Sequence, residues 1–258
     1  MWLGLSVAGT RRRLVGRRNA GRGGLAAQAG LIAFAALAYF GVRGLTRSEH
    51  AVAAQNAEML VTAQSRLSLD LEPAVQRTVI DHDWLVTVAN WIYIFGHWPL
   101  IAAVLTWLYL VARPDFRILR DAMFISGAIG LVIFALFPVA PPRLGVLEVV
   151  DTVSERSMTY RALQPPSLTN PYAALPSLHV GWNLLLGIMI WRVGASPLLR
   201  VFAVVMPALM VFAVVATANH YVVDVLAGAV VALVGLALAR RLRDRRAGMS
   251  VPSSVVSR

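Results

Sequence analysis

The chain has 258 residues, 58% of them hydrophobic and 14% charged, and a net charge of +11. Because a soluble domain carries about 25% charged residues, this composition excludes an ordinary soluble enzyme and indicates that lipid surrounds much of the chain. The absence of cysteine excludes disulfides, thiolate metal sites and a cysteine nucleophile. All basic residues are arginine and they lie at the edges of apolar runs, so we expect no nucleic acid partner. The bias toward Ala, Val, Leu and Arg is typical of a GC-rich bacterial genome.

The apolar runs predict an all-α, polytopic membrane protein with six transmembrane helices in a bundle, since each span needs roughly 20 apolar residues. Residues 1–24 are basic and rich in glycine, and are expected to form a cytoplasmic tail. Residues 25–83 are predicted to contain the first span, at 25–42, followed by a polar segment on the outer surface. Part of that segment, residues 51–71, is expected to be helical.

The main membrane domain is predicted over residues 84–240, with a second cytoplasmic tail over residues 241–258. Its five spans are expected at residues 84–112, 122–140, 176–193, 201–217 and 220–239. The first of these is long enough to be tilted or kinked, and Pro99 supplies a reason for a kink. The arginines of residues 113–120 are expected in a short loop. The Pro-rich residues 141–175 are expected to form the longest internal loop.

The distribution of arginine predicts the orientation of the bundle. With six spans, both termini and the loops near residues 113 and 196 share one side, and that side holds most of the arginines. Loops rich in Lys and Arg face the cytoplasm. We therefore expect a multi-pass protein of the cell membrane whose termini are cytoplasmic and whose Pro-rich loop is extracytoplasmic.

His220 and Asp224 form the most suggestive pair in the sequence. In a helix, residues four apart lie on one face, one turn from each other. Asp224 is the only carboxylate inside any predicted span, and a charge there costs roughly 2.5–3.5 kcal/mol on insertion scales. A hydrogen bond from the His220 ring would reduce that cost and fix the imidazole tautomer. The spacing fits a catalytic pair and a purely structural bridge between helices equally well.

Several short strings resemble a known family. Pro176-Ser177-Leu178-His179 resembles the second signature of the type 2 phosphatidic acid phosphatase superfamily, and His220-x-x-x-Asp224 resembles its third. Residues 90–99, 137–144, 170–175 and 220–225 are similar to one branch, the inositol phosphorylceramide synthases and related bacterial proteins. The resemblance covers roughly residues 80–240.

The resemblance implies a His/His/Asp site on the extracytoplasmic face. In that superfamily the histidine at the position of His220 attacks phosphorus and becomes a phosphohistidine. The aspartate at the position of Asp224 orients that histidine and places a negative charge beside it. The histidine at the position of His179 protonates the leaving oxygen. Imidazole suits both tasks, because its pKa near 6.5 allows it to act as acid and then as base. No metal and no cofactor is implied.

The sequence departs from the broad superfamily at two positions that would bind phosphate. The usual first signature pairs a lysine with Arg-Pro, but this chain has no lysine. Arg143 is the first candidate to replace it, and Arg156 and Arg161 are alternates. The arginine expected six residues before the catalytic histidine is Val214 here. The same gaps occur in the synthase branch, so they favour transfer over hydrolysis.

Four further residues are candidate substrate contacts. Asn170 and Tyr172 precede His179 within the family-like strings, although loop packing explains them nearly as well. His97 either bonds across helices beside Pro99 or contacts the lipid. Asn183, one turn beyond His179, faces the same side and could bond its ring.

We therefore expect a membrane phosphotransferase that moves a phosphate or phospho-headgroup from a lipid to an alcohol such as inositol or another lipid. The alternative is a lipid phosphate phosphatase, for example one that acts on a polyprenyl phosphate, with water as the acceptor. The partners expected are a lipid phosphate or phospholipid, a polyol or lipid acceptor or water, and membrane lipids. A haem protein with two histidine ligands and a transporter are weaker alternatives; the paired Asp224 argues against the first, and no broken-helix pair or inverted repeat indicates the second.

Overall fold

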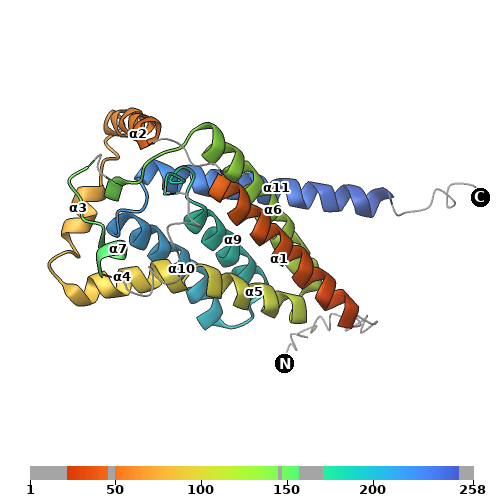
Figure 1. Cartoon of the computed structure of the whole chain (residues 1–258). Coiled ribbons are helices and arrows are strands. Elements are labelled where there is room, and N and C mark those ends of the chain that lie inside the picture. The colour runs from red at the N-terminus through yellow and green to blue at the C-terminus, as the bar shows by residue number, and fades with distance from the viewer. Residues whose placement is uncertain (1–21, 46–49, 145–146, 157–170, 250–258) are drawn as a thin grey trace, which may run out of the picture. The chain divides into compact units, whose positions relative to one another are not determined.

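The computed structural model describes residues 22–45, 50–144, 147–156 and 171–249, and all regular elements in these ranges are helical (Figure 1). The predicted all-α class is confirmed for this part of the chain. Two compact units are distinguished, residues 1–38 and 39–258. Helix α1, Arg22–Leu45, contains the predicted first span and crosses the division between the units. The second unit carries the candidate site and is described by itself.

Within the described residues, three helices are long and apolar enough to cross a membrane. They are α6, Arg113–Leu136; α10, Pro197–Ala216; and the part of α11 from Val222 to Arg245. A fourth span results if α4, Asp83–Phe95, and α5, Trp98–Val111, count as one broken helix. Helix α9, Leu178–Val193, is apolar but shorter. These lengths make the chain a membrane protein, and the predicted count of six spans stays a prediction.

The predicted kink lies between α4 and α5, whose axes differ by 46°. The break falls at Gly96 and His97, and Pro99 occupies the first turn of α5. Proline suits that position because the first N–H groups of a helix have no partner within it. A kink was therefore predicted correctly, but the break precedes the proline.

Two predicted boundaries are wrong. The arginine-rich residues 113–120 were expected in a loop, but α6 begins at Arg113, with Pro114 and Asp115 in its first turn. Both residue types favour a helix N-terminus. The sixth span was expected to begin at His220, but α11, Val222–Met249, begins two residues later and continues into the predicted tail.

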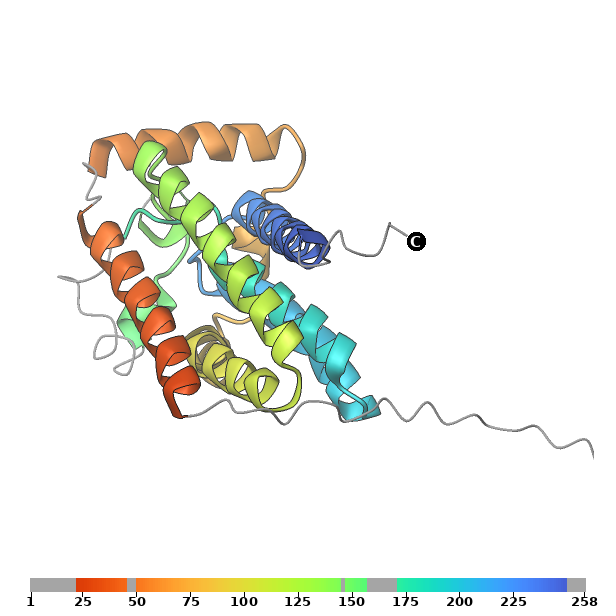
Figure 2. The same cartoon turned by 90° about the vertical axis from the view of Figure 1, so that its right-hand side faces the viewer.

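The core of the second unit is a group of four helices. Helix α9 packs against α6, α10 and α11, and α11 also packs against α6, as the views in Figures 1 and 2 show. Helix α4 lies along α10, and α5 contacts α6. Buried residues occur all around α9, which is typical of a helix enclosed by others. This enclosure explains why most residues of this 16-residue helix are apolar.

The outer helix faces expose large apolar side chains. Leu136 is 79% exposed, Leu198 77% and Leu110 73%. Many exposed apolar side chains of this size on α5, α6 and α10 would be unfavourable in water. Their exposure agrees with lipid as the surrounding solvent.

The polar segment before α4 forms two short helices, α2, His50–Ser65, and α3, Glu72–Arg77. Helix α2 contacts α11, and α3 contacts α10. Asn56 of α2 donates to the carbonyl of Pro138 at 2.8 Å, and Gln76 of α3 donates to the carbonyls of Val150 and Ala216. The segment predicted as a surface element therefore holds loops at the end of the bundle. That end also contains the 3-10 turn Pro142–Leu144 and α7, Thr152–Arg156.

Candidate active site

Helices α9 and α11 begin side by side because glycines permit their backbones to meet. A Cβ atom on Gly228 would lie 2.1 Å from the carbonyl oxygen of Ser177, and one on Gly181 would lie 2.5 Å from that of Gly228. The Ser177 N–H donates to the Asp224 carbonyl at 2.9 Å. These contacts bring the first turns of the two helices, and with them His179 and Asp224, to one place.

The loop that carries His220 is a tight reversal at the end of α10. Ala218 has a positive φ of 55°, and its N–H donates to Val215 O while that of Asn219 donates to Val214 O. This pair of bonds defines a Schellman motif, which usually places glycine in the left-handed position. The His220 N–H also donates to Val214 O at 3.1 Å. The main chain at His220 is thus tied to the last turn of α10.

The His220 ring is oriented by a carbonyl group. Its Nδ1 lies 2.8 Å from the carbonyl oxygen of Ala174 and 3.6 Å from Oδ2 of Asp224. A carbonyl oxygen can only accept, so Nδ1 carries the proton and Nε2 carries the lone pair. The predicted pairing of His220 with Asp224 is present at 3.6 Å, but the prediction that both residues lie on one helical face is wrong, because His220 precedes α11. Asp224 acts on the ring across the longer distance.

Asp224 caps the helix in which it lies. Its side chain is fully buried, and Oδ2 accepts from the Tyr221 N–H at 2.8 Å. A carboxylate at the third helical position that reaches back to the N-cap N–H is one half of a capping box. Its Oδ1 has no hydrogen-bond partner among the described protein atoms. Asp224 therefore places negative charge beside the His220 ring and stabilises the first turn of α11.

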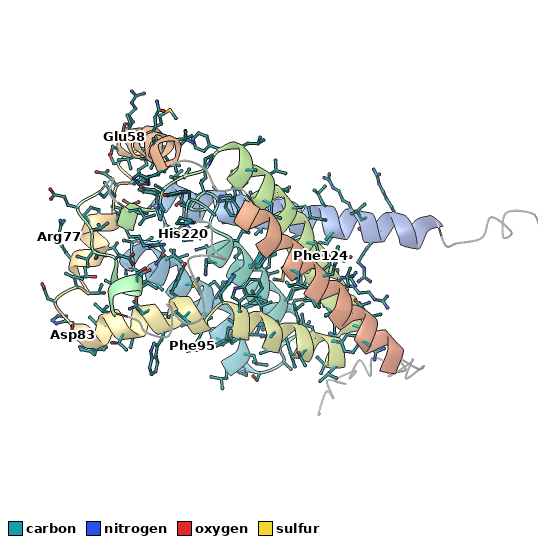
Figure 3. All side chains as sticks on the ribbon, in the orientation of Figure 1. Glu58, Arg77, Asp83, Phe95, Phe124 and His220 are labelled. Atoms are coloured by element: carbon teal, nitrogen blue, oxygen red, sulfur yellow. The ribbon has the colours of Figure 1, made fainter. Side chains whose placement is uncertain are left out.

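His179 lies in the first turn of α9 within a stack of rings. Its centroid is 5.8 Å from that of His220, 4.5 Å from that of Tyr93 and 4.1 Å from that of His97. The Tyr93 ring is nearly parallel to it, at 20°. The structure thus brings His179, His220 and Asp224 together. His220 lies inside the end of the bundle at which Arg77 and Asp83 point outward (Figure 3).

His97 is a third histidine of this cluster. It immediately precedes α5, is only 4% exposed, and stacks on Trp182 at 5.6 Å with an interplanar angle of 8°. The indole N–H of Trp182 donates to the Ser126 hydroxyl at 3.1 Å. The ring of His97 thus contacts the rings of both Trp182 and His179, and its two predicted roles, a bond across helices and a contact with the lipid, stay predictions.

Asn183 braces the backbone around His179. Its side-chain amide donates to the carbonyls of Gly96, at 3.1 Å, and His179, at 3.0 Å. The side chain is only 1% exposed. These contacts tie the α4–α5 break to the start of α9. They go to main-chain carbonyls and not to the His179 ring, so the expectation that Asn183 bonds that ring is wrong.

Arg143 lies next to the histidine loop. Its main-chain N–H donates to Ala218 O, and its Nε donates to Oδ1 of Asn219 at 3.1 Å. Nη1 pairs with Asp151 at 2.7 Å and approaches the hydroxyl of Ser154. This guanidinium is therefore held one residue from His220. Val214, at the position of the superfamily arginine, is fully buried.

The remaining predicted contacts are less informative. Asn170 and Arg161 lie outside the described residues, and the side chain of Arg156 is not described. Tyr172 is partly buried, its carbonyl accepts from Val139 N at 2.8 Å, and its ring lies 5.8 Å from that of His50. These contacts suit loop packing. Within the described ranges no group of three or more His, Cys, Asp or Glu side chains could hold a metal ion, and the expected absence of a metal stays a prediction.

A second buried carboxylate lies near His220, at the start of α11, and no sequence pattern predicted it. Glu72 of α3 is fully buried, and its Oε1 accepts from the N–H of Val222 at 2.7 Å. It belongs to the segment that was assigned to the outer surface. Pro73 after Glu72 signals the start of a helix, but no local pattern reports that the carboxylate faces inward.

An apolar groove lies beside the α4–α5 break. It has a volume of about 490 Å³ and lies between α4, α5 and α10. Its lining comprises Val88, Trp91, Ile92, Phe95, Gly96, Leu100, Phe202 and Met206. Gly96, which lines the groove, directly precedes His97 of the histidine cluster in the chain.

Comparison with known proteins gives a consistent result. Residues 58–238, well over half of the chain, match the family model described as PAP2 superfamily. The fold is similar to the crystal structure of Aquifex aeolicus LpxE, with a TM-score of 0.53 and 14% sequence identity over 67% of this chain and 94% of that chain. At this identity the likeness concerns the fold. No curated protein sequence matches the chain.

Proposed function

Because the chain belongs to the PAP2 superfamily, and is thus a lipid phosphatase or phosphotransferase, we propose that it cleaves the phosphate ester of a membrane lipid through a phosphohistidine on His220. The observation that carries the proposal is the pairing of the His179 and His220 imidazoles, whose ring centroids lie 5.8 Å apart. The Nδ1–H of His220 donates a hydrogen bond to the Ala174 carbonyl. A single phosphate group bridges rings at that separation, and the bond to Ala174 presents Nε2 as the nucleophile.

The reaction has two balanced steps. In the first, the Nε2 lone pair attacks phosphorus, the bond from phosphorus to the lipid oxygen breaks, and His179 gives its proton to that oxygen. In the second, His179 takes a proton from water while the water oxygen attacks phosphorus and the N–P bond breaks. The products are the lipid alcohol and inorganic phosphate, and both histidines return to their starting states.

The neighbouring charges assist at different points. Asp224 favours the positive charge that His220 gains as its nitrogen bonds to phosphorus, since the carboxylate lies 3.6 Å from Nδ1. Arg143 offers a planar cation to the phosphoryl oxygens, a geometry that suits phosphate. Asp151 and Asn219 hold that cation in place before the substrate arrives.

The membrane supplies the substrate from the side. We propose six spans, made of the three helices that meet the length criterion, the broken pair α4 and α5 as one span, α1 and the enclosed α9, and a site on the extracytoplasmic face of the cell membrane. The arginines on α6, α9 and α11 then face the cytoplasm. A hydrocarbon chain of the lipid lies in the apolar groove beside Gly96, with its phosphate at His179 and His220.

Transfer to an alcohol is the second candidate. The fully buried Val214 and the lack of lysine match the inositol phosphorylceramide synthase branch that the strings resemble. In this case the hydroxyl of inositol or of a lipid replaces water in the second step, and the residues keep their roles.

One experiment tests both candidates. Purified protein in detergent is given a lipid phosphate labelled with ³²P, with and without inositol, beside His220→Ala. Release of inorganic phosphate supports hydrolysis, and labelled inositol phosphate or a new lipid product supports transfer. An acid-labile, base-stable label on the wild-type protein indicates phosphohistidine. Turnover by His220→Ala equal to that of the wild type would contradict the covalent mechanism.

A further inference from the structure

The first turn of α11 receives its hydrogen bonds from another part of the chain. The opening N–H groups of a helix have no partners within it. Here the Val222 N–H donates to Oε1 of Glu72 at 2.7 Å, and that of Val223 approaches Oε1 of Gln64 at 3.5 Å. Glu72 and Gln64 come from α3 and α2, at the end of the bundle where α11 begins (Figure 1). The start of α11 is therefore fixed from outside.

Hydrogen bonds satisfy both oxygens of the Glu72 carboxylate. Both of its oxygens accept from the Gln64 side-chain amide, at 2.8 and 2.9 Å, and both side chains are nearly inaccessible, with exposures of 0% and 1%. A buried carboxylate is costly unless hydrogen bonds satisfy it, and a negative charge at a helix N-terminus is favoured. The arrangement is rigid because each partner is held by the other.

His220 lies between two fixed points of the main chain. On one side its own N–H is bonded to Val214 O of α10. On the other, two residues later, Val222 is bonded to Glu72. Only the torsion angles of His220 and Tyr221 separate these anchors, and the Tyr221 ring is itself fully buried. The position of the His220 ring therefore depends on the contact at Val222.

We propose that Glu72, held by Gln64, is a positioning residue for the imidazole of His220. This inference rests on the proposed role of His220 as the nucleophile. The Glu72–Gln64 pair fixes the start of α11, so that Nδ1 meets the Ala174 carbonyl and Nε2 points at the phosphorus. Reactions of this kind are sensitive to a misplacement of about 1 Å, which can cost on the order of 100-fold in rate.

The test exchanges the two side chains. Glu72→Gln sets two amide groups against each other, and Gln64→Glu sets two carboxylates against each other. The double variant Gln64→Glu/Glu72→Gln restores one carboxylate facing one amide. We expect each single variant to lower kcat by about 10- to 100-fold with little change in KM, and the double variant to recover most of the loss.

A matched control separates positioning from folding. Asn56→Ala removes another buried side-chain hydrogen bond of α2, which goes to Pro138 O rather than to α11. We expect it to lower the melting temperature while kcat per folded molecule stays within about 2-fold of wild type. If Glu72→Gln behaves in the same way, or if the double variant recovers nothing, the positioning role is contradicted.

A second readout does not depend on the substrate. Carbethoxylation of His220 by diethyl pyrocarbonate, followed by peptide mass spectrometry, reports the reactivity of its ring. We expect its rate to change in Glu72→Gln, to return in the double variant, and to stay unchanged in Asn56→Ala. If this pattern holds but the wild type turns over no lipid phosphate, the proposed function fails and the positioning role stands. An unchanged rate in Glu72→Gln contradicts the positioning role whatever the activity.

Discussion

At the end of the bundle that holds His220, buried side chains bond to main-chain groups, as Glu72 does to Val222 and Asn183 does to Gly96. At the other end of α9, Arg192 makes an ion pair with Asp115 at 2.7 Å while its side chain stays 58% exposed. The two ends lie about 24 Å apart along a 16-residue helix. Buried hydrogen bonds hold side chains in fixed positions, whereas exposed ion pairs contribute little energy. The end of the bundle around His220 is therefore held in a defined geometry, and the end around Arg192 is held only by weak charge interactions.

The largest effect is expected at the nucleophile. His220→Ala should lower kcat by at least about 10⁴-fold, because the covalent step has no substitute. The assay is release of labelled phosphate in detergent, and loss of the phosphohistidine label should accompany it. His82→Ala, which removes an exposed histidine, is the matched control and should keep wild-type kcat. Equal kcat in the two variants would contradict the role of His220 as the nucleophile.

The next effect tests the close approach of α9 and α11. In Gly228→Ala the added Cβ would meet the Ser177 carbonyl oxygen at 2.1 Å, and two backbones must separate. Overpacking of this kind costs roughly 1–3 kcal/mol, and the histidines should move apart, so we expect both melting temperature and kcat to fall. Gly41→Ala, whose Cβ would meet nothing within 4 Å, is the control. If Gly228→Ala loses stability but keeps kcat, the spacing of the two helices does not set the activity.

The fold of the bundle was largely predictable, and the geometry of the site only in part. Apolar runs and proline identified the helices and the kink, because lipid demands long apolar segments. Histidine and aspartate strings identified His179, His220 and Asp224. The Ala174 carbonyl was not predictable, because every residue has a carbonyl group and only the folded loop brings this one to Nδ1.

Glu72 and Gln64 show a second limit of prediction from the sequence. A polar segment outside the spans looks like a solvated surface, and only tertiary contact buries it. The first residue of α11 was missed for a related reason: its N-terminus is capped locally by Asp224 and by Glu72, which is distant in the sequence. Apolar periodicity locates a membrane helix but not its first residue.

The groove beside Gly96 gives a smaller and more selective effect. Val88→Trp should fill part of it, since Val88 lines the groove and is 44% exposed. We expect kcat/KM for a long-chain lipid phosphate to fall by about 10-fold while that for a short-chain analogue stays unchanged, because a lost hydrophobic contact costs on the order of 1–3 kcal/mol. Val132→Trp, on the exposed face of α6, is the control. An equal loss for both chain lengths would contradict a hydrocarbon site in the groove.

The smallest effect is expected at the arginine end. Arg192→Ala removes a mostly exposed partner of Asp115, and such pairs contribute about 0.2–1 kcal/mol, so the melting temperature should shift by only a few degrees and kcat should not change. Salt should reduce the difference between variant and wild type, because exposed charges are screened. Asp115 would not be left as an isolated buried charge, since it lies at the N-terminus of α6, where a negative charge is favoured. A loss of unfolding free energy above about 3 kcal/mol, as for a broken buried pair, would mean that this end is held as tightly as the end around His220. The contrast between the two ends would then be contradicted.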